Sequence, residues 1–164
     1  MFSFNLTSFS DSYFAGCKID KKSTSGTCHM LESSLISWHC KKQACVPLST
    51  AEAEYIAAGS CCAQTLWLRQ QLSDFGILLN KIPIQCDNTS VVNLSKNPVM
   101  HSRTKHIEIK HHFLREHIDN GTCEIKVIGT ELQLVDLFTK PLAKERFNFL
   151  INELRIISIN CPLQ

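Results

Sequence analysis

Two glutamates one residue apart, Glu52 and Glu54, lie in the segment STAEAEYIAAG (residues 49–59), whose other residues are typical of a buried helix. Ser49 and Glu52 form the S-x-x-E pattern of a capping box, in which both side chains bond free amides at the start of a helix. Each residue turns a helix by roughly 100°, so Glu54 lies about 200° from Glu52. Glu54 therefore begins the apolar stripe, where a charge needs a partner or a cation. The spacing gives Glu52 a structural role and makes Glu54 a candidate for chemistry.

Three aspartates, Asp11, Asp87 and Asp136, have comparable positions. We expect Asp11 to end the first strand and Asp87 to follow the strand IPIQC, at the strand end where open α/β sheets place their sites. Asp136 lies in TELQLVDLFTK, where Thr130 and Gln133 form a second capping-box pattern. Asp136 then falls in the second helical turn and is not needed as a cap. With no matching lysine or arginine adjacent, four such carboxylates would repel one another unless they held divalent metal.

Each acid also has an ordinary structural interpretation. An aspartate at the end of a strand is commonly a turn residue, and Asp87 with Asn88 could simply cap the helix that follows. Glu54 could be a partly exposed helix glutamate. The metal-site hypothesis therefore depends on the four acids as a set.

The hydrophobic pattern predicts the elements that would position these acids. Phe2, Phe4 and Leu6 alternate with polar residues, which is typical of a strand running toward Asp11. Further strands are predicted at residues 27–31, 35–41, 82–86 and 123–128, with a turn at 20–26. Helices are predicted from residue 49 to a stop at Gly76, at 89–96, at 104–118, from 130 to the break before 141, and around 147–154. A strand followed by a helix indicates a parallel portion, so we expect a mixed α/β sheet in one domain, residues 1–164, with a core of about 4–155.

The composition fits a single globular domain. A chain of 164 residues with 44% hydrophobic and 20% charged residues can bury a sizeable core, which argues against disorder. The net charge of +2 permits a polyanionic partner without requiring one. The sequence shows neither a signal peptide nor an apolar run near the ~18 residues of a membrane span. We expect an intracellular protein with no membrane partner.

The cysteine and histidine content raises the possibility of structural zinc. The chain has nine cysteines, but His101 and His106 are accompanied by no Cys-x-x-Cys pair, and Cys61 and Cys62 are adjacent. Zinc is therefore the weaker interpretation. We expect reduced cysteines that serve mostly as small core residues.

Four segments, FSDSYFAGCKIDKKSTSG, LISWHCKKQACVPLSTAEAEYIAA, IQCDNTSVVNLSKNPVMHSRTKHIEIKHHFLRE and QLVDLFTKPLAKERF, closely resemble the ribonuclease H domain of Pol polyproteins from copia-type LTR retrotransposons, especially plant ones. The resemblance extends over residues 9–154. It implies a ribonuclease H-like, mixed five-stranded sheet flanked by helices. It also implies an Asp-Glu-Asp-Asp set binding two Mg²⁺ ions, for which Mn²⁺ could substitute. The matching catalytic and metal-binding residues are Asp11, Glu54, Asp87 and Asp136.

The activity implied by the resemblance is two-metal hydrolysis of the RNA strand of an RNA–DNA hybrid during reverse transcription. The implied partners are the hybrid and the reverse transcriptase domain of the parent polyprotein, in the cytoplasm within a virus-like particle or in the nucleus. The oligomeric state stays open. Candidate hybrid contacts are Asn88, Lys41, Lys42, Arg103, Lys105 and His106. For the last three, a solvated helix face is the alternative.

Some features depart from the family pattern. Residues 127–135 lack the histidine that cellular relatives often carry before the fourth carboxylate, and Val135 replaces a common alanine. The chain also contains no reverse transcriptase or integrase segment. The alternative function is therefore a catalytically inactive relic, or a hybrid-binding domain of a decayed element.

Overall fold

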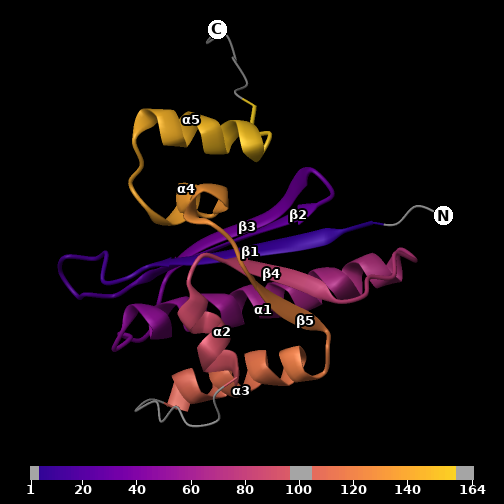
Figure 1. Cartoon of the computed structure of the whole chain (residues 1–164), viewed down its shortest axis with the longest axis horizontal. Helices are drawn as coiled ribbons and strands as arrows, with labels where there is room; N and C mark the ends of the chain where they lie inside the picture. The colour runs from indigo at the N-terminus through magenta and orange to yellow at the C-terminus, as the bar shows by residue number, and fades with distance from the viewer. Residues whose placement is uncertain (1–3, 97–104, 158–164) are drawn as a thin grey trace, which may run out of the picture.

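The computed structural model describes residues 4–96 and 105–157, which contain one five-stranded sheet (Figure 1). The strands are β1 (Leu6–Tyr13), β2 (Thr24–Leu31), β3 (Ser34–Lys42), β4 (Ile82–Cys86) and β5 (Cys123–Val127), in the spatial order β3-β2-β1-β4-β5. β2 pairs antiparallel with β1 and β3, whereas β4 pairs parallel with β1 and β5. The predicted mixed sheet is confirmed.

Helices cover both faces of this sheet. They are α1 (Thr50–Asp74), α2 (Thr89–Lys96), α3 (Lys105–Asp119), α4 (Asp136–Thr139) and α5 (Lys144–Glu153), with a 3-10 turn at Thr130–Leu132. In Figure 1, α1, α2 and α3 lie on one side of the sheet, and α4 and α5 lie on the other. Among the described residues, no helix is both long and apolar enough to span a membrane.

The long helix α1 has the two ends that the sequence predicts. Ser49 is its N-cap, and the Ser49 hydroxyl accepts a hydrogen bond from the Glu52 amide at 3.1 Å. At the other end Gly76 has φ +77°, and its amide donates to the Ser73 carbonyl at 2.9 Å. Glycine suits this left-handed position because it has no Cβ.

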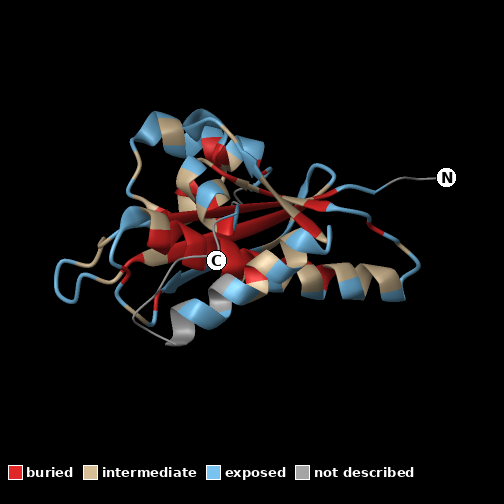
Figure 2. Cartoon of the chain, turned by 60° about the horizontal axis from the view of Figure 1, so that its bottom comes forward, coloured by how far each residue is buried: buried red, intermediate tan, exposed pale blue. Residues whose placement is uncertain are grey.

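The main core lies between the sheet and α1. Its buried members are Tyr55, Ala58, Cys61, Cys62, Ile84, Cys86, Val91, Leu114 and Cys123. Figure 2 shows the buried residues concentrated in the sheet and on the helix surfaces that face it. Five of the eight described cysteines are buried, so most of them fill the core as predicted.

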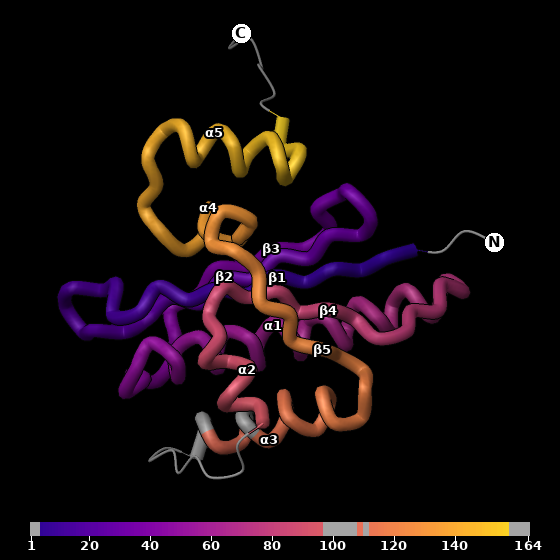
Figure 3. Tube along the Cα trace, viewed as in Figure 1, coloured from indigo at the N-terminus to yellow at the C-terminus, as the bar shows by residue number. Residues whose placement is uncertain are grey.

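On the opposite face, Gly26 lets α4 pack closely against β2. A Cβ at Gly26 would lie 2.4 Å from Thr139 Cγ2 and 2.7 Å from Val135 Cγ1, closer than real contacts allow. Gly26 is also the register partner of Asp11 in the β1–β2 ladder. Figure 3 shows the chain crossing the sheet after β5 to reach α4. The missing side chain at Gly26 therefore brings α4 beside Asp11.

Strand β1 differs from its predicted limits. Phe2 lies outside the described residues, and Phe4 precedes the strand and is 40% exposed. The strand continues beyond Asp11 to Tyr13 because its ladder with β2 extends to Thr24. Asp11 consequently lies inside the strand and not at its end, which corrects the prediction.

Candidate metal centre

Asp11 is held in the interior by two side-chain donors, Thr139 at the end of α4 and Lys140, the residue that follows α4. Its side chain is fully buried. Thr139 Oγ1 donates to Asp11 Oδ2, and Lys140 Nζ donates to Oδ1 at 3.0 Å. Burial raises the pKa of Asp11, and the Thr139 bond and the Lys140 charge offset that rise in part. Residues more than 120 positions apart in the chain thus fix this carboxylate.

Asp87 directly follows β4, which lies beside β1 in the sheet. Its side chain is half-buried. Asn88 Oδ1 accepts a hydrogen bond from the Ser90 amide at 2.9 Å, at the start of α2. Asn88 therefore caps that helix, and Asp87 is not required for the capping role considered from the sequence.

The predicted capping box before Asp136 is wrong. Thr130 begins the 3-10 turn after Gly129, with no capping bond from a side chain. Gln133 is fully buried and instead donates through Nε2 to the Ser10 carbonyl at 3.0 Å. Asp136 is the first residue of α4 and does not fall in a second turn. Gln133 reaches β1 because the segment before α4 crosses the sheet there, which a local pattern does not reveal.

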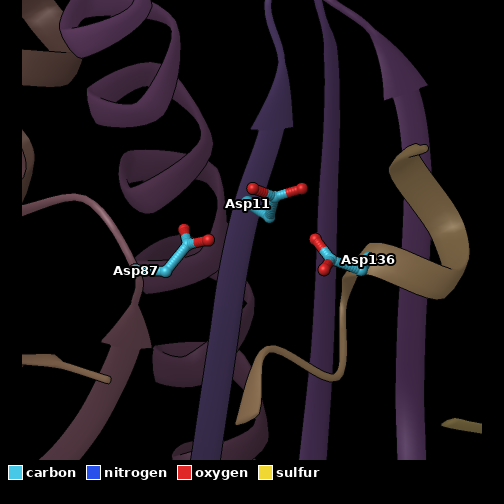
Figure 4. Close-up of side chains that lie close together, drawn as sticks. All are labelled: Asp11, Asp87 and Asp136. Carbon is cyan, nitrogen blue, oxygen red and sulfur yellow. The ribbon is translucent and has the colours of Figure 1, made fainter. Parts of the chain in front are cut away.

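The three aspartates converge at one place. Asp11, Asp87 and Asp136 each offer a carboxylate oxygen, and these oxygens lie within 4.8 Å of one another. In Figure 4, Asp11 on β1 lies between Asp87, at the end of β4, and Asp136, at the start of α4. Asp11 and Asp136 are buried. This convergence can bind a cation.

Glu54 lies beside this triad on α1 and is 4% exposed. Its Oε1 accepts a hydrogen bond from the Ser12 amide at 3.2 Å. Its Oε2 is buried with no hydrogen-bond partner in the described part of the chain. Burial raises the pKa of Glu54 to about 8, with further contributions from the charges of Asp11 and Asp87. We call Asp11, Glu54, Asp87 and Asp136 the acidic centre.

Glu52 has the capping role predicted for it, with one difference. Its carboxylate accepts a hydrogen bond from the Leu48 amide. A capping box would direct it to the amide of Ser49, so the glutamate half of the box is shifted by one residue. Both glutamates are 4% exposed, but Glu52 bonds the Leu48 amide at the start of the helix, whereas Glu54 bonds the Ser12 amide of β1. These partners agree with the predicted division of roles.

The expectation that no lysine or arginine accompanies the acids is wrong. Lys140 Nζ lies 3.0 Å from Asp11 Oδ1 and 2.8 Å from Asp136 Oδ1. Arg146 Nη2 lies 3.7 Å from Asp136 Oδ2. Burial alone would lower the pKa of Lys140, but its contacts with Asp136 and Asp11 outweigh burial and raise it. One lysine therefore neutralises part of the acidic centre.

The donor set suits a divalent ion. Carboxylate oxygens are the ligands that Mg²⁺ and Mn²⁺ prefer. The three converging aspartates offer more carboxylate groups than the single ammonium of Lys140 can balance, and Glu54 Oε2 beside them has no hydrogen-bond partner among the described residues. The convergent oxygens belong to the three aspartates, and Glu54 lies outside the 4.8 Å set.

The predicted hybrid contacts lie in different parts of the chain. Lys41 and Lys42 are exposed at the end of β3, and Lys42 forms a 2.8 Å ion pair with Asp20. Lys41 pairs with Ser25 of β2, which pairs with Ser12 of β1, so both lysines lie at the end of the sheet that carries Asp11. The remaining predicted contacts are less fully described. Arg103 lies outside the described residues, as do the side chains of Lys105 and His106, the first two residues of α3.

Sequence reasoning missed three residues in and next to α4 that support the acids. Thr139, Lys140 and Gln133 all contact β1 or its aspartate. The available signal was spacing, because Lys140 lies four residues after Asp136, where helical side chains meet. No local signal pointed from α4 to Asp11.

The chain is similar in sequence to plant transposon polyproteins, although no family model matches it. It is 36% identical over 142 residues to the retrovirus-related Pol polyprotein from transposon TNT 1-94 of Nicotiana tabacum, covering 87% of this chain and 11% of the relative. It is 40% identical over 144 residues to that from transposon RE1 of Arabidopsis thaliana, covering 87% and 10%. The chain thus spans about a tenth of the length of these relatives.

Solved structures similar to the chain include ribonucleases H. The N-terminal RNase H domain of a Mycobacterium tuberculosis protein matches with a TM-score of 0.59 at 10% identity, covering 92% of this chain and 98% of that one. LC11-RNase H1, crystallised with an RNA/DNA hybrid, matches with a TM-score of 0.56 at 11% identity, covering 82% and 94%. The protease-reverse transcriptase of prototype foamy virus matches with a TM-score of 0.53 at 12% identity, covering 95% and 21%. At these identities the likeness shows the fold.

Proposed function

We propose, because this chain belongs with the retrovirus-related Pol polyproteins of plant transposons and has the ribonuclease H fold, that it is a metal-dependent ribonuclease H. Its substrate is the RNA strand of an RNA–DNA hybrid. The observation that carries the proposal is the convergence of Asp11, Asp87 and Asp136 within 4.8 Å, with Glu54 buried beside them. These are the four positions that the sequence resemblance assigned to catalysis.

In this mechanism the four acids share one role, and neighbouring donors keep two of them oriented. Asp11, Glu54, Asp87 and Asp136 would hold divalent ions, preferably Mg²⁺, with Mn²⁺ as a substitute. When bound, such ions lower the pKa of the attacking water and stabilise the charge on the leaving oxygen. Thr139 and the Ser12 amide keep Asp11 and Glu54 oriented before the substrate arrives. The burial of these acids excludes bulk water from their oxygens and strengthens their attraction for cations.

The substrate proposal depends on the chemical groups that an RNA–DNA hybrid presents on its surface. Hybrid duplexes offer phosphates and 2′-hydroxyls, which can be recognised without reading bases, so we expect little sequence preference. LC11-RNase H1 was crystallised with such a hybrid. Lys41 and Lys42 are exposed at the correct end of the sheet to contact a phosphate backbone. The partner within the cell would be the reverse transcriptase domain of the same polyprotein, and the location intracellular.

The test is cleavage of a labelled RNA–DNA hybrid by the purified chain in Mg²⁺ or Mn²⁺. We expect endonucleolytic cuts in the RNA strand, none in EDTA, and none in a DNA duplex. Asp87→Asn should lower the rate about a hundredfold or more, because it removes a metal-binding charge but keeps the side-chain shape. Asp74→Asn, at the exposed end of α1, is the matched control and should cut normally. Equal rates for both variants would contradict the proposed site.

A catalytically inactive, hybrid-binding domain is the second candidate. The observation that favours it is the bridge of Lys140 to Asp11 and Asp136, which partly neutralises the acidic centre. In that case the protein would retard a labelled hybrid in a gel but cut it in neither metal. Cleavage that disappears in Asp87→Asn would rule this candidate out.

A further inference from the structure

Lys140 occupies an unusual position for a lysine, because its ammonium group bridges two members of a candidate metal centre. Nζ donates to Asp11 Oδ1 at 3.0 Å and to Asp136 Oδ1 at 2.8 Å. Asp11 and Asp136 are themselves two of the three acids whose oxygens lie within 4.8 Å of one another. The ammonium therefore uses the same carboxylates that a divalent ion would need.

The backbone of Lys140 is held by α4, whereas its side chain is partly exposed to solvent. Lys140 is the C-cap of α4, and its amide donates to the Asp136 carbonyl at 3.1 Å. Its side chain is 28% exposed, although Asp11 beneath it is fully buried. A four-carbon stem with one partly exposed side can rotate toward solvent without disturbing α4.

We propose that Lys140 is a tethered cation that competes with a divalent ion for Asp11 and Asp136, so that it stabilises the metal-free fold and sets the affinity for metal. The proposal depends on the metal-binding part of the proposed function but not on cleavage. Mg²⁺ needs carboxylate oxygens at about 2.0–2.1 Å in a near-octahedral arrangement. The Lys140 ammonium, held by carboxylate oxygens of Asp11 and Asp136, occupies this space and repels the ion. Binding of the ion between Asp11 and Asp136 therefore displaces Nζ.

The other contacts of these two acids support a mobile cation at this point. Asp11 Oδ2 accepts from Thr139, a neutral donor that leaves the charge of Asp11 in place. Arg146 Nη2 lies 3.7 Å from Asp136 Oδ2, but the same guanidinium donates to the Thr130 and Glu131 carbonyls. Arg146 is therefore tied to the backbone. Lys140 Nζ, by contrast, bonds these two carboxylates and no backbone carbonyl among the described residues, so its release costs no backbone contact.

Competition and simple structural support predict different results for a neutral residue at this position. If Lys140 only supports the fold, its removal lowers stability equally with and without metal. If Lys140 competes, its removal lowers stability in EDTA, because Asp11 and Asp136 then repel each other with no cation between them. The same removal makes metal binding tighter, since the ion no longer displaces a positive charge.

The experiment measures Mn²⁺ binding to the metal-free chain by calorimetry, together with the melting temperature in EDTA and in Mg²⁺. Lys140→Met keeps the length of the stem and removes the charge. We expect its Mn²⁺ dissociation constant to fall about tenfold, the factor produced by a modest change in charge interaction. Its melting temperature should drop in EDTA and rise more with Mg²⁺ than that of the wild type. Lys140→Gln should behave in the same way.

The matched control is Lys126→Met on β5. Lys126 pairs with Glu124 at 2.9 Å and is 55% exposed, and among the described residues no ion pair or hydrogen bond joins it to the acidic centre. We expect its Mn²⁺ affinity and metal response to equal those of the wild type. If Lys140→Met does not fold in EDTA, its recovery by Mg²⁺ supports the proposal, and its failure to fold with metal overturns it.

Unchanged or weaker Mn²⁺ binding in both neutral variants would also overturn the proposal. These readouts contain no substrate, so they separate this inference from the proposed function. If the wild-type chain binds Mn²⁺ but cuts no hybrid, only the proposed ribonuclease activity is contradicted. If the enzyme is active but Lys140→Met has unchanged metal affinity, only the proposed competition by Lys140 is contradicted.

Discussion

Two buried polar clusters contact strand β1, one neutral and one charged. In the neutral cluster, the Ser8 hydroxyl is hydrogen-bonded to His29 Nδ1 at 2.8 Å and to the Thr65 hydroxyl at 2.7 Å. Thr65 also donates to the Cys61 carbonyl at 2.8 Å. Burial lowers the pKa of His29 to about 4, so its ring is uncharged at neutral pH. This uncharged cluster joins β1, β2 and α1 through hydrogen bonds, although His29 Nε2 is buried with no partner in the described part of the chain.

The acidic centre begins three residues further along the same strand, at Asp11. Each cluster has one buried atom without a hydrogen-bond partner among the described residues, but in the acidic centre it is a carboxylate oxygen, Glu54 Oε2. Burial and the charges of Asp11 and Asp87 raise the pKa of Glu54 to about 8. A cation must balance such a group, either from the chain, as Lys140 does, or from solution. The contrast teaches that burial alone does not mark a functional site. Buried charge in excess of its partners does.

The largest effect should separate the two neighbouring glutamates. Glu54→Gln should lower hybrid cleavage about a hundredfold or more, because it removes a metal-binding charge. It should cost little stability, because glutamine keeps the size of the side chain and an oxygen that can still accept the hydrogen bond from the Ser12 amide. The measurements are cleavage rate and unfolding free energy.

Glu52→Gln is the matched control on the same helix turn. Its amide oxygen can still accept the bond from the Leu48 amide, so activity should stay close to that of the wild type. Equal losses of activity in the two variants would contradict the assignment of Glu54 to the acidic centre.

A smaller effect should follow from moving α4 relative to β2. In Gly26→Ala, the new Cβ meets Thr139 Cγ2 and Val135 Cγ1, so α4 must shift away from Asp11. We expect a loss of about 1–3 kcal/mol in unfolding free energy. Cleavage should fall with it, because small displacements of reacting groups are costly.

A second substitution tests whether that loss comes from the contact. Gly26→Ala with Thr139→Ser removes the nearest methyl group and keeps the hydroxyl that donates to Asp11. Part of the stability and activity should return. No recovery relative to Gly26→Ala would mean that α4 is positioned in some other way.

Local signals were sufficient for the limits of α1 and for separating the two neighbouring glutamates. The limits of α1 follow from Ser49 and Gly76, whose capping roles depend on neighbours within a few residues. The same is true of Glu52 and Glu54, because helical rotation alone places them on different sides. The parallel pairing of β4 with β1 follows from a strand followed by a helix.

Long-range contacts explain what the sequence did not reveal. Gln133 matched a capping pattern, yet its amide bonds the Ser10 carbonyl, 123 residues away. Lys140 was overlooked for the same reason, since its contact with Asp11 joins residues 129 apart. A local pattern contains no information about which strand a crossing segment will meet, so these contacts needed the structure.

The smallest effect should be the pH dependence of stability that His29 gives to the neutral cluster. The pKa of His29 is about 4 in the folded chain and about 6.5 in the unfolded one, so acid favours the unfolded state, which binds the proton first. The contribution to stability is complete above pH 6.5 and is lost as the pH falls toward 4. Between pH 7 and pH 5 we expect a loss of about 2 kcal/mol in unfolding free energy, measured by denaturant unfolding.

His29→Gln should remove that part of the pH dependence, whereas His39→Gln, on the exposed surface of β3, should keep it. The same pH dependence in His29→Gln and the wild type would show that His29 is not buried in its neutral form.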